Sequence, residues 1–233
     1  MTNFQDQNRI TWKQFISGSV IISIIVPIVI GISLRILFAL NFIQQTYNSN
    51  TLKILEIFLL DLFILLFTIC FILTYKPFYN LILDTLNIKP LKKGKTYLYI
   101  LLANISTILL DKTTNLLSSN SGNIQGTTLG LDTLSEQSML IYIIAMLSFI
   151  LLGPVFEEIF YRGIILRFLE VKHTFLIGLI VSSFLFGLAH SYDFIFVIFA
   201  MLTAIIDGLL YKKTQSIIPV LFGHIIYNLY VFI

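Results

Sequence analysis

Charged residues are scarce in this chain: they make up 12% of its 233 residues, while hydrophobic residues make up 57%. Because soluble domains carry about 25% charged residues, a chain of this composition could not cover a soluble surface. Disordered proteins are excluded by the same shortage, since they are polar and rich in charge. Cys70 is the single cysteine, which excludes an intrachain disulfide scaffold. The composition therefore predicts an all-α polytopic membrane protein.

Long apolar runs support this fold class. A helix that crosses a bilayer core about 30 Å thick needs about 20 predominantly apolar residues, because lipid cannot satisfy open backbone groups. The sequence predicts a transmembrane helical bundle of about seven spans, and Pro154 is expected to break the fourth. The predicted spans cover residues 15–42, 52–75, 96–110, 139 to beyond 154, 175–189, 194–211 and 217–233.

The distribution of basic residues predicts an orientation. Alternating spans place the N-terminus, the segment 76–95, the region 162–173 and the turn 212–213 on one side of the membrane. These segments hold 12 of the 15 basic residues: Arg9, Lys13, Lys76, Lys89, Lys92, Lys93, Lys95, Arg162, Arg167, Lys172, Lys212 and Lys213. Since cytoplasmic loops carry the excess of Lys and Arg, we expect a cytoplasmic N-terminus. The net charge of +3 is then explained by basic residues that orient the protein in the lipid bilayer and face anionic lipid. No nucleic acid partner is expected.

Two segments between spans have distinct patterns. Residues 78–91 place apolar side chains at helical spacing and are followed by a basic run at 92–95, which predicts an amphipathic helix on the cytoplasmic surface. Residues 118–130 are rich in Ser, Asn, Gly and Thr, which predicts a flexible external loop. We expect residues 1–95 to hold the N-terminal spans and the amphipathic helix, and residues 96–233 to form the membrane bundle with its catalytic core at about 139–233.

Ionisable and amide side chains inside spans are costly, and by default they mark a functional site. They cluster in three short C-terminal segments. The first reads GPVFEEIFYRG over 153–163, the second FLFGLAH over 184–190, and the third GHIIYN over 223–228. His224 and Asn228 are four residues apart, so they share one helix face. Two histidines and an asparagine are hard to explain as packing residues alone.

The adjacent glutamates of the first segment are expected to differ in role. Glu158 and Arg162 are four residues apart on a helix and can pair. Glu157 is rotated by about 100° from Glu158 and has no obvious cationic partner, which suits a general base. A solvated helix end at the cytoplasmic boundary would also accommodate these charges. On this pattern Glu157 is a candidate for the chemistry and Glu158 for its support.

Two kinds of hydrolysis are compatible with these side chains. In one, Glu157 and His190 activate a water while His224 and Asn228 donate hydrogen bonds to the developing oxyanion. In the other, His190, His224 and either Glu157 or Glu158 ligate Zn²⁺. No HExxH motif, GxSG or GxGD is present, and no cysteine lies near these segments. Asp207 is interpreted as a structural acid, and Glu56 and Asp61 as acids that pair with polar neighbours or face a cavity.

The three segments resemble the motifs of a known family. Glu157-Glu158-xxx-Arg162, Phe186-xxx-His190 and His224-xxx-Asn228 are similar to the motifs of the CPBP family, the CAAX-protease and bacteriocin-processing membrane proteins also called Abi proteins. The order of the motifs and the helices on which they fall agree, and the resemblance covers about residues 139–233. Each motif alone is weak, whereas three in order on separate membrane helices are specific.

The resemblance implies an intramembrane endopeptidase of the glutamate type, with no metal cofactor expected. Glu157 and His190 would activate water, His224 and Asn228 would form the oxyanion site, and Glu158 and Arg162 would support them. The implied substrate is a membrane-associated peptide or protein. The Ile-, Asn- and Lys-rich composition is typical of a bacterium with low GC content, so we expect a bacterial cytoplasmic membrane protein in bacteriocin or signalling-peptide processing, or in self-immunity. A non-catalytic membrane immunity or scaffold protein and a zinc-dependent protease are the alternatives.

Overall fold

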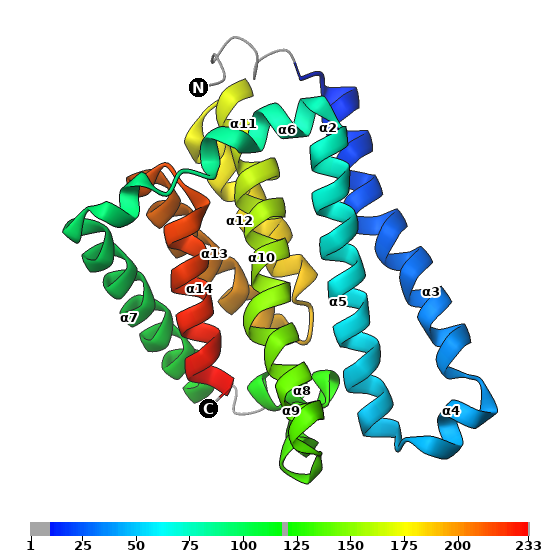
Figure 1. Ribbon diagram of the computed structural model, residues 1–233. Coiled ribbons are helices and arrows are strands. Elements are labelled where there is room, and N and C mark those ends of the chain that lie inside the picture. The colour runs from blue at the N-terminus through cyan, green and yellow to red at the C-terminus, as the bar shows by residue number, and fades with distance from the viewer. Residues whose placement is uncertain (1–9, 118–120, 233) are drawn as a thin grey trace.

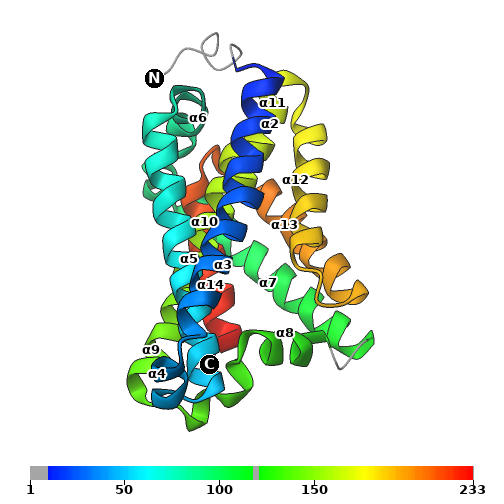
Figure 2. The same cartoon turned by 90° about the vertical axis from the view of Figure 1, so that its right-hand side faces the viewer.

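A computed structural model describes residues 10–117 and 121–232, which form helices and no strand (Figure 1). The bundle has two ends. The start of α2 (Trp12–Val20), α6 (Lys76–Ile82) and α11 (Arg167–Lys172) lie at one end, and α4 (Asn41–Thr46), α8 (Ser121–Leu129) and the start of α9 (Met139–Leu147) lie at the other (Figures 1 and 2). Between the ends run α3 (Val26–Phe38), α5 (Ser49–Thr74), α7 (Gly94–Leu117), α10 (Gly153–Glu157), α12 (Phe175–Ala189), α13 (Phe194–Thr214) and α14 (Ile217–Phe232).

Each predicted span coincides with a helix. Four helices in the described ranges are long and apolar enough to cross a membrane: Trp12–Phe38, Ser49–Thr74, Met139–Lys172 and Phe194–Thr214. The apolar helices α12 and α14 are shorter, and α7 is not among the four although it has 24 residues. The helical membrane fold is therefore confirmed, while the count of seven spans and the orientation stay predictions.

The fourth span is continuous, so the expected break at Pro154 is wrong. Residues Met139–Lys172 form one helix of 34 residues. Two π-helical segments flank α10 within it, η5 (Ser148–Leu152) and η6 (Glu158–Leu166). The Gly153 N–H donates to the Ser148 carbonyl five residues earlier, and this widened turn accommodates the proline that follows. At 1.5 Å per residue such a helix is about 50 Å long, more than a bilayer core requires.

The external loop predicted over 118–130 is only partly a loop. Residues 121–129 form α8, and residues 118–120 lie outside the described ranges. Gly130 adopts a positive φ of 73°, the left-handed conformation that commonly follows a helix end. The Lys53 ammonium donates to the Thr127 carbonyl at 2.7 Å, which satisfies a carbonyl near the end of this helix. A contact with α5, distant in sequence, thus supports a helix that the composition alone does not predict.

The predicted amphipathic helix over 78–91 is shorter than expected. The α-helix α6 covers Lys76–Ile82, and short 3₁₀ turns follow at Leu83–Thr85 and Lys89–Lys92. Its apolar residues Phe78, Leu81 and Ile82 are buried inside the protein. The apolar face of α6 therefore packs against the bundle.

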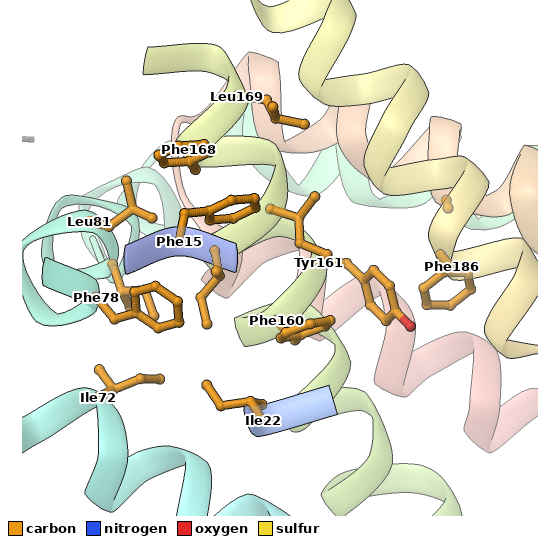
Figure 3. Packing of buried hydrophobic residues seen from close by; sticks show 14 of the residues in the cluster. Phe15, Ile22, Ile72, Phe78, Leu81, Phe160, Tyr161, Phe168, Leu169 and Phe186 are labelled. Carbon is orange, nitrogen blue, oxygen red and sulfur yellow. The ribbon is translucent and has the colours of Figure 1, made fainter. Parts of the chain in front are cut away.

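The main core joins this end of the bundle to the long helix (Figure 3). Phe15 of α2 stacks on Phe168 of α11 with ring centroids 3.8 Å apart. Gly18 makes room for Phe78, because a Cβ at that glycine would lie 2.7 Å from the ring. Since lipid is as apolar as these side chains, close packing and not the hydrophobic effect holds such helices together.

Glycines let α12 approach its neighbours closely. A Cβ at Gly178 would lie 2.7 Å from the Leu166 carbonyl oxygen on the long helix. A Cβ at Gly187 would lie 2.8 Å from the Val197 carbonyl oxygen on α13. Backbone atoms cannot give way as side-chain ends do, so both positions require glycine or a shifted helix. This packing fixes the end of α12, where His190 follows, against α13 and the long helix.

Candidate active site

A cavity of about 650 Å³ lies among α5, α7, the long helix, α12, α13 and α14. All four residues predicted to be catalytic line it: Glu157, His190, His224 and Asn228. Glu158 and Arg162 are buried and contact two residues of the wall, His224 and Asp207. The structure therefore brings together the three sequence segments, which lie on separate helices.

The Glu157 carboxylate lies between two imidazoles. Its Oε1 is 3.5 Å from Nε2 of His190, and its Oε2 is 3.6 Å from Nε2 of His224. The three side chains are mostly buried yet partly open to the cavity. The sequence leaves Glu157 without a cationic partner, whereas the fold gives each of its oxygens an imidazole neighbour. A carboxylate held in this way can accept a proton from a bound water.

His190 is oriented by the helix turn that precedes it. Its Nδ1 lies 2.9 Å from the Phe186 carbonyl oxygen, and because a carbonyl only accepts, Nδ1 must carry the proton. Nε2 is thereby left facing Glu157. The Phe186 ring also stacks on the imidazole, with centroids 4.4 Å apart. Phe186 thus contributes both a hydrogen bond acceptor and a packing surface to the second motif.

His224 is oriented by the second glutamate. Glu158 Oε1 accepts hydrogen bonds from Nδ1 of His224 and from Nη1 of Arg162, both at 2.9 Å. The predicted pairing of Glu158 with Arg162 is confirmed, and both side chains are only 1% exposed. Since Nδ1 is taken by Glu158, the His224 Nε2 is directed toward Glu157. The buried ion pair therefore sets the orientation of an imidazole in the cavity.

Asp207 belongs to the same network, although the sequence places it as a structural acid. Its Oδ2 lies 3.3 Å from Nη2 of Arg162, and its side chain lines the cavity. The same Nη2 also donates to the Ala204 carbonyl oxygen at 3.3 Å. The cost of a carboxylate in a span was the one signal that could have pointed to this residue.

Asn228 bonds a backbone carbonyl that the long helix leaves free. Its Nδ2 donates to the Phe149 oxygen at 2.8 Å. In an α-turn the donor to this oxygen would be the Gly153 N–H, which goes to Ser148 instead. In a π-turn the donor would be residue 154, which is proline and has no N–H. One N–H of the Asn228 amide is thus used for structure, and the second stays available to the cavity.

The side chains that could hold a metal ion have competing partners. Within the described residues, ligand atoms of Glu158, Asp207 and His224 lie within 4.8 Å of one another. The Arg162 guanidinium contacts both of these carboxylates, and a cation there opposes binding of a second one. His190, part of the zinc set that the sequence suggests, is not in this group. This cluster fits an internal ion-pair network better than a metal centre.

Residues 139–230 match the family model described as "Type II CAAX prenyl endopeptidase Rce1-like". No curated protein and no solved structure matches the chain. The matched range includes the three motifs and the acid Asp207, and it excludes the N-terminal helices α2 to α7. The family resemblance seen in the motifs is thereby confirmed.

Proposed function

We propose that this chain is an intramembrane endopeptidase in which Glu157 and His190 activate water, on the premise that residues 139–230 match the Rce1-like family model of CAAX-type endopeptidases. The observation that carries the proposal is the position of the Glu157 carboxylate, between two imidazoles at the wall of a cavity. A general base beside an oriented imidazole is the arrangement that water activation requires.

The proposed reaction uses the geometry of each side chain. A water in the cavity hydrogen-bonds to Glu157 and His190, gives a proton to Glu157 and attacks the peptide carbonyl. His224 and the second N–H of Asn228 stabilise the oxyanion of the tetrahedral intermediate. Glu157 then returns its proton to the leaving amine, so the peptide bond is replaced by a carboxylic acid and an amine. In this role both ring nitrogens of His224 carry a proton, with Nδ1 donating to Glu158 and Nε2 directed toward Glu157 and the oxyanion.

Glu158, Arg162 and Asp207 act as positioning residues in this proposal. They contact one another and His224, and they hold the imidazole without facing the scissile bond. We propose that the reaction needs no metal, because Arg162 supplies the positive charge among these carboxylates. A zinc-dependent form of the same protease would use His190, His224 and Glu157 or Glu158.

We propose seven spans with a cytoplasmic N-terminus. The end of the bundle that holds α6 and α11 also holds the turn between α13 and α14 (Figure 1). Basic residues lie in or next to these segments: Lys76, Arg167, Lys172, Lys212 and Lys213. A cluster of Lys and Arg at one end supports a cytoplasmic location for that end. The cavity lining includes residues of α8 and of the C-terminal end of α14, two segments that this orientation places in the external half.

The proposed substrate is a membrane-associated peptide or protein of a bacterial cytoplasmic membrane. A role in bacteriocin or signalling-peptide processing, or in self-immunity, follows from the family resemblance and the composition of the chain. A non-catalytic immunity or scaffold role is the alternative, and it predicts that the phenotype tolerates loss of Glu157.

Cleavage by the purified full-length protein in lipid vesicles tests the proposal. We expect wild type to cleave quenched apolar peptides, and Glu157→Ala and His190→Ala to lose cleavage while they still insert and stay folded. Glu136→Ala is the matched control, because Glu136 is exposed and lies outside the cavity wall. Cleavage that survives both active-site substitutions would overturn the proposal.

A further inference from the structure

A polar stripe on α7 forms one wall of the cavity. Asn104, Thr107, Asp111 and Thr114 are spaced three or four residues apart, so they share one helix face, and all four line the cavity. Thr107 and Thr114 are buried. This stripe makes α7 more polar than the helices that are apolar enough to span a membrane. It also lies outside residues 139–230, the range that matches the family. The proposed reaction does not use these four polar side chains, so their role must be a different one.

Apart from histidines, the charged side chains of the cavity wall are all acidic. The described residues that line the cavity include four carboxylates, namely Asp61, Asp111, Glu157 and Asp207, and no Lys or Arg. Glu157 and Asp207 contact the imidazoles and Arg162. Asp61 and Asp111 instead accept hydrogen bonds from neutral groups, the Ser148 hydroxyl and the Asn115 amide. Lys112, the sequence neighbour of Asp111, is exposed and not part of the lining.

Asn104 gives a second, independent observation. Its side chain is only 7% exposed and lines the cavity, and its Oδ1 has no hydrogen bond partner among the described residues. Its Nδ2 donates to the Ile100 carbonyl and lies close to Gly223, directly before His224. Burying a carbonyl without a hydrogen bond partner is unfavourable, so a donor from a bound ligand would be favourable here.

Aromatic rings complete the wall. Tyr192, Phe196, Phe199, Tyr227 and Tyr230 line the same cavity. The faces of aromatic rings attract ammonium and guanidinium groups, and they also pack against the apolar stem of a lysine or arginine. Carboxylates, a carbonyl without a hydrogen bond partner and aromatic faces together suit a long side chain with an apolar stem and a cationic end.

We propose that this cavity is a specificity subsite for a lysine or arginine side chain of the peptide substrate, with Asp111 on the polar stripe of α7 receiving the cationic head. The subsite rests on the proposed protease function and specifies its substrate class. A cation entering the cavity offsets the cost of carboxylates kept away from bulk water. A neutral or acidic residue at the same substrate position gains nothing from them.

The test uses the full-length protein in lipid vesicles and quenched peptides that differ at one position. Each peptide places lysine, arginine, norleucine or glutamate at successive positions of one apolar sequence. We expect lysine or arginine at one position to raise kcat/KM over norleucine, and glutamate to lower it. Asp111→Asn should lower the ratio of kcat/KM between the lysine and norleucine peptides by about tenfold, the typical effect of losing one hydrogen bond to a charged group.

The controls separate this subsite from the protease activity. Asp132→Asn makes the same charge change on an exposed residue outside the lining and should keep the full preference. Glu157→Gln should lose cleavage of every peptide. Equal cleavage of lysine and norleucine peptides by wild type, or an equal loss on all peptides in Asp111→Asn, overturns the subsite and leaves the protease intact. Absence of cleavage by folded wild type overturns the protease and the subsite with it.

Discussion

The side-chain amide of Asn228 is bonded to the backbone oxygen of Phe149 at 2.8 Å, which ties α14 to the widened turn of the long helix. This carbonyl is free because Gly153 bonds Ser148 and residue 154 is proline. The third motif is therefore positioned by an irregularity in the helix that carries the first. A regular helix over 139–172 would offer no acceptor at this place.

Asn228→Ala should destabilise the fold by about 1 kcal/mol, the scale of a side-chain hydrogen bond between membrane helices. In a Pro154→Ala background the loss should be smaller, because the restored N–H supplies another donor near the Phe149 oxygen. A double-mutant cycle of thermal unfolding in detergent measures this coupling. Equal losses in both backgrounds would show that the proline does not free the carbonyl.

Arg162→Met should destabilise the protein by about 3–5 kcal/mol, because it leaves the buried Glu158 carboxylate without its ion pair. Asp207 and the Ala204 carbonyl lose the same partner. The matched control is Arg35→Met, since Arg35 pairs with Glu56 but its side chain is 81% exposed. Thermal unfolding in detergent compares the two, and similar midpoints would contradict the role of the buried network.

Gly187→Ala should move α12 away from α13 and reduce cleavage, because the added Cβ would lie 2.8 Å from a backbone oxygen. His190 follows the displaced end of α12, so the rate of cleavage should fall while the protein stays folded. Gly31→Ala is the control, since no atom lies within 4 Å of a Cβ at that position. Unchanged cleavage by folded Gly187→Ala would show that the site tolerates a wider helix spacing.

Removal of divalent metals should leave cleavage unchanged. In the proposed reaction Glu157 and His190 activate water by themselves, and Arg162 contributes the positive charge beside Glu158 and Asp207. Chelator treatment followed by rate measurement and metal analysis of the purified protein checks this. Loss of cleavage that zinc restores would favour the zinc-dependent alternative.

Local patterns predicted much of the fold and of the site. Apolar runs located the helices, and the spacing of Glu158 and Arg162 predicted their pairing, since both features depend on neighbours along one helix. The pairing of Asp207 with Arg162 was missed because the two residues are 45 apart in sequence, and only the packing of α13 brings them together. The helix α8 was missed because its support comes from Lys53 on α5. The widened turns around Pro154 likewise depend on contacts with other helices, such as the bond from Asn228.

The most direct test of the central claim is a comparison of newly formed peptide N-termini in membranes of the source cells. Cells that express wild type are compared with cells that express Glu157→Gln at equal levels, a substitution that keeps the size of the side chain but removes the base. We predict N-termini from at least one membrane-associated peptide or protein that occur with wild type and fall by a factor on the order of 100 or more with Glu157→Gln. Identical sets of N-termini in the two strains would contradict the assignment of Glu157 as the base of an intramembrane protease.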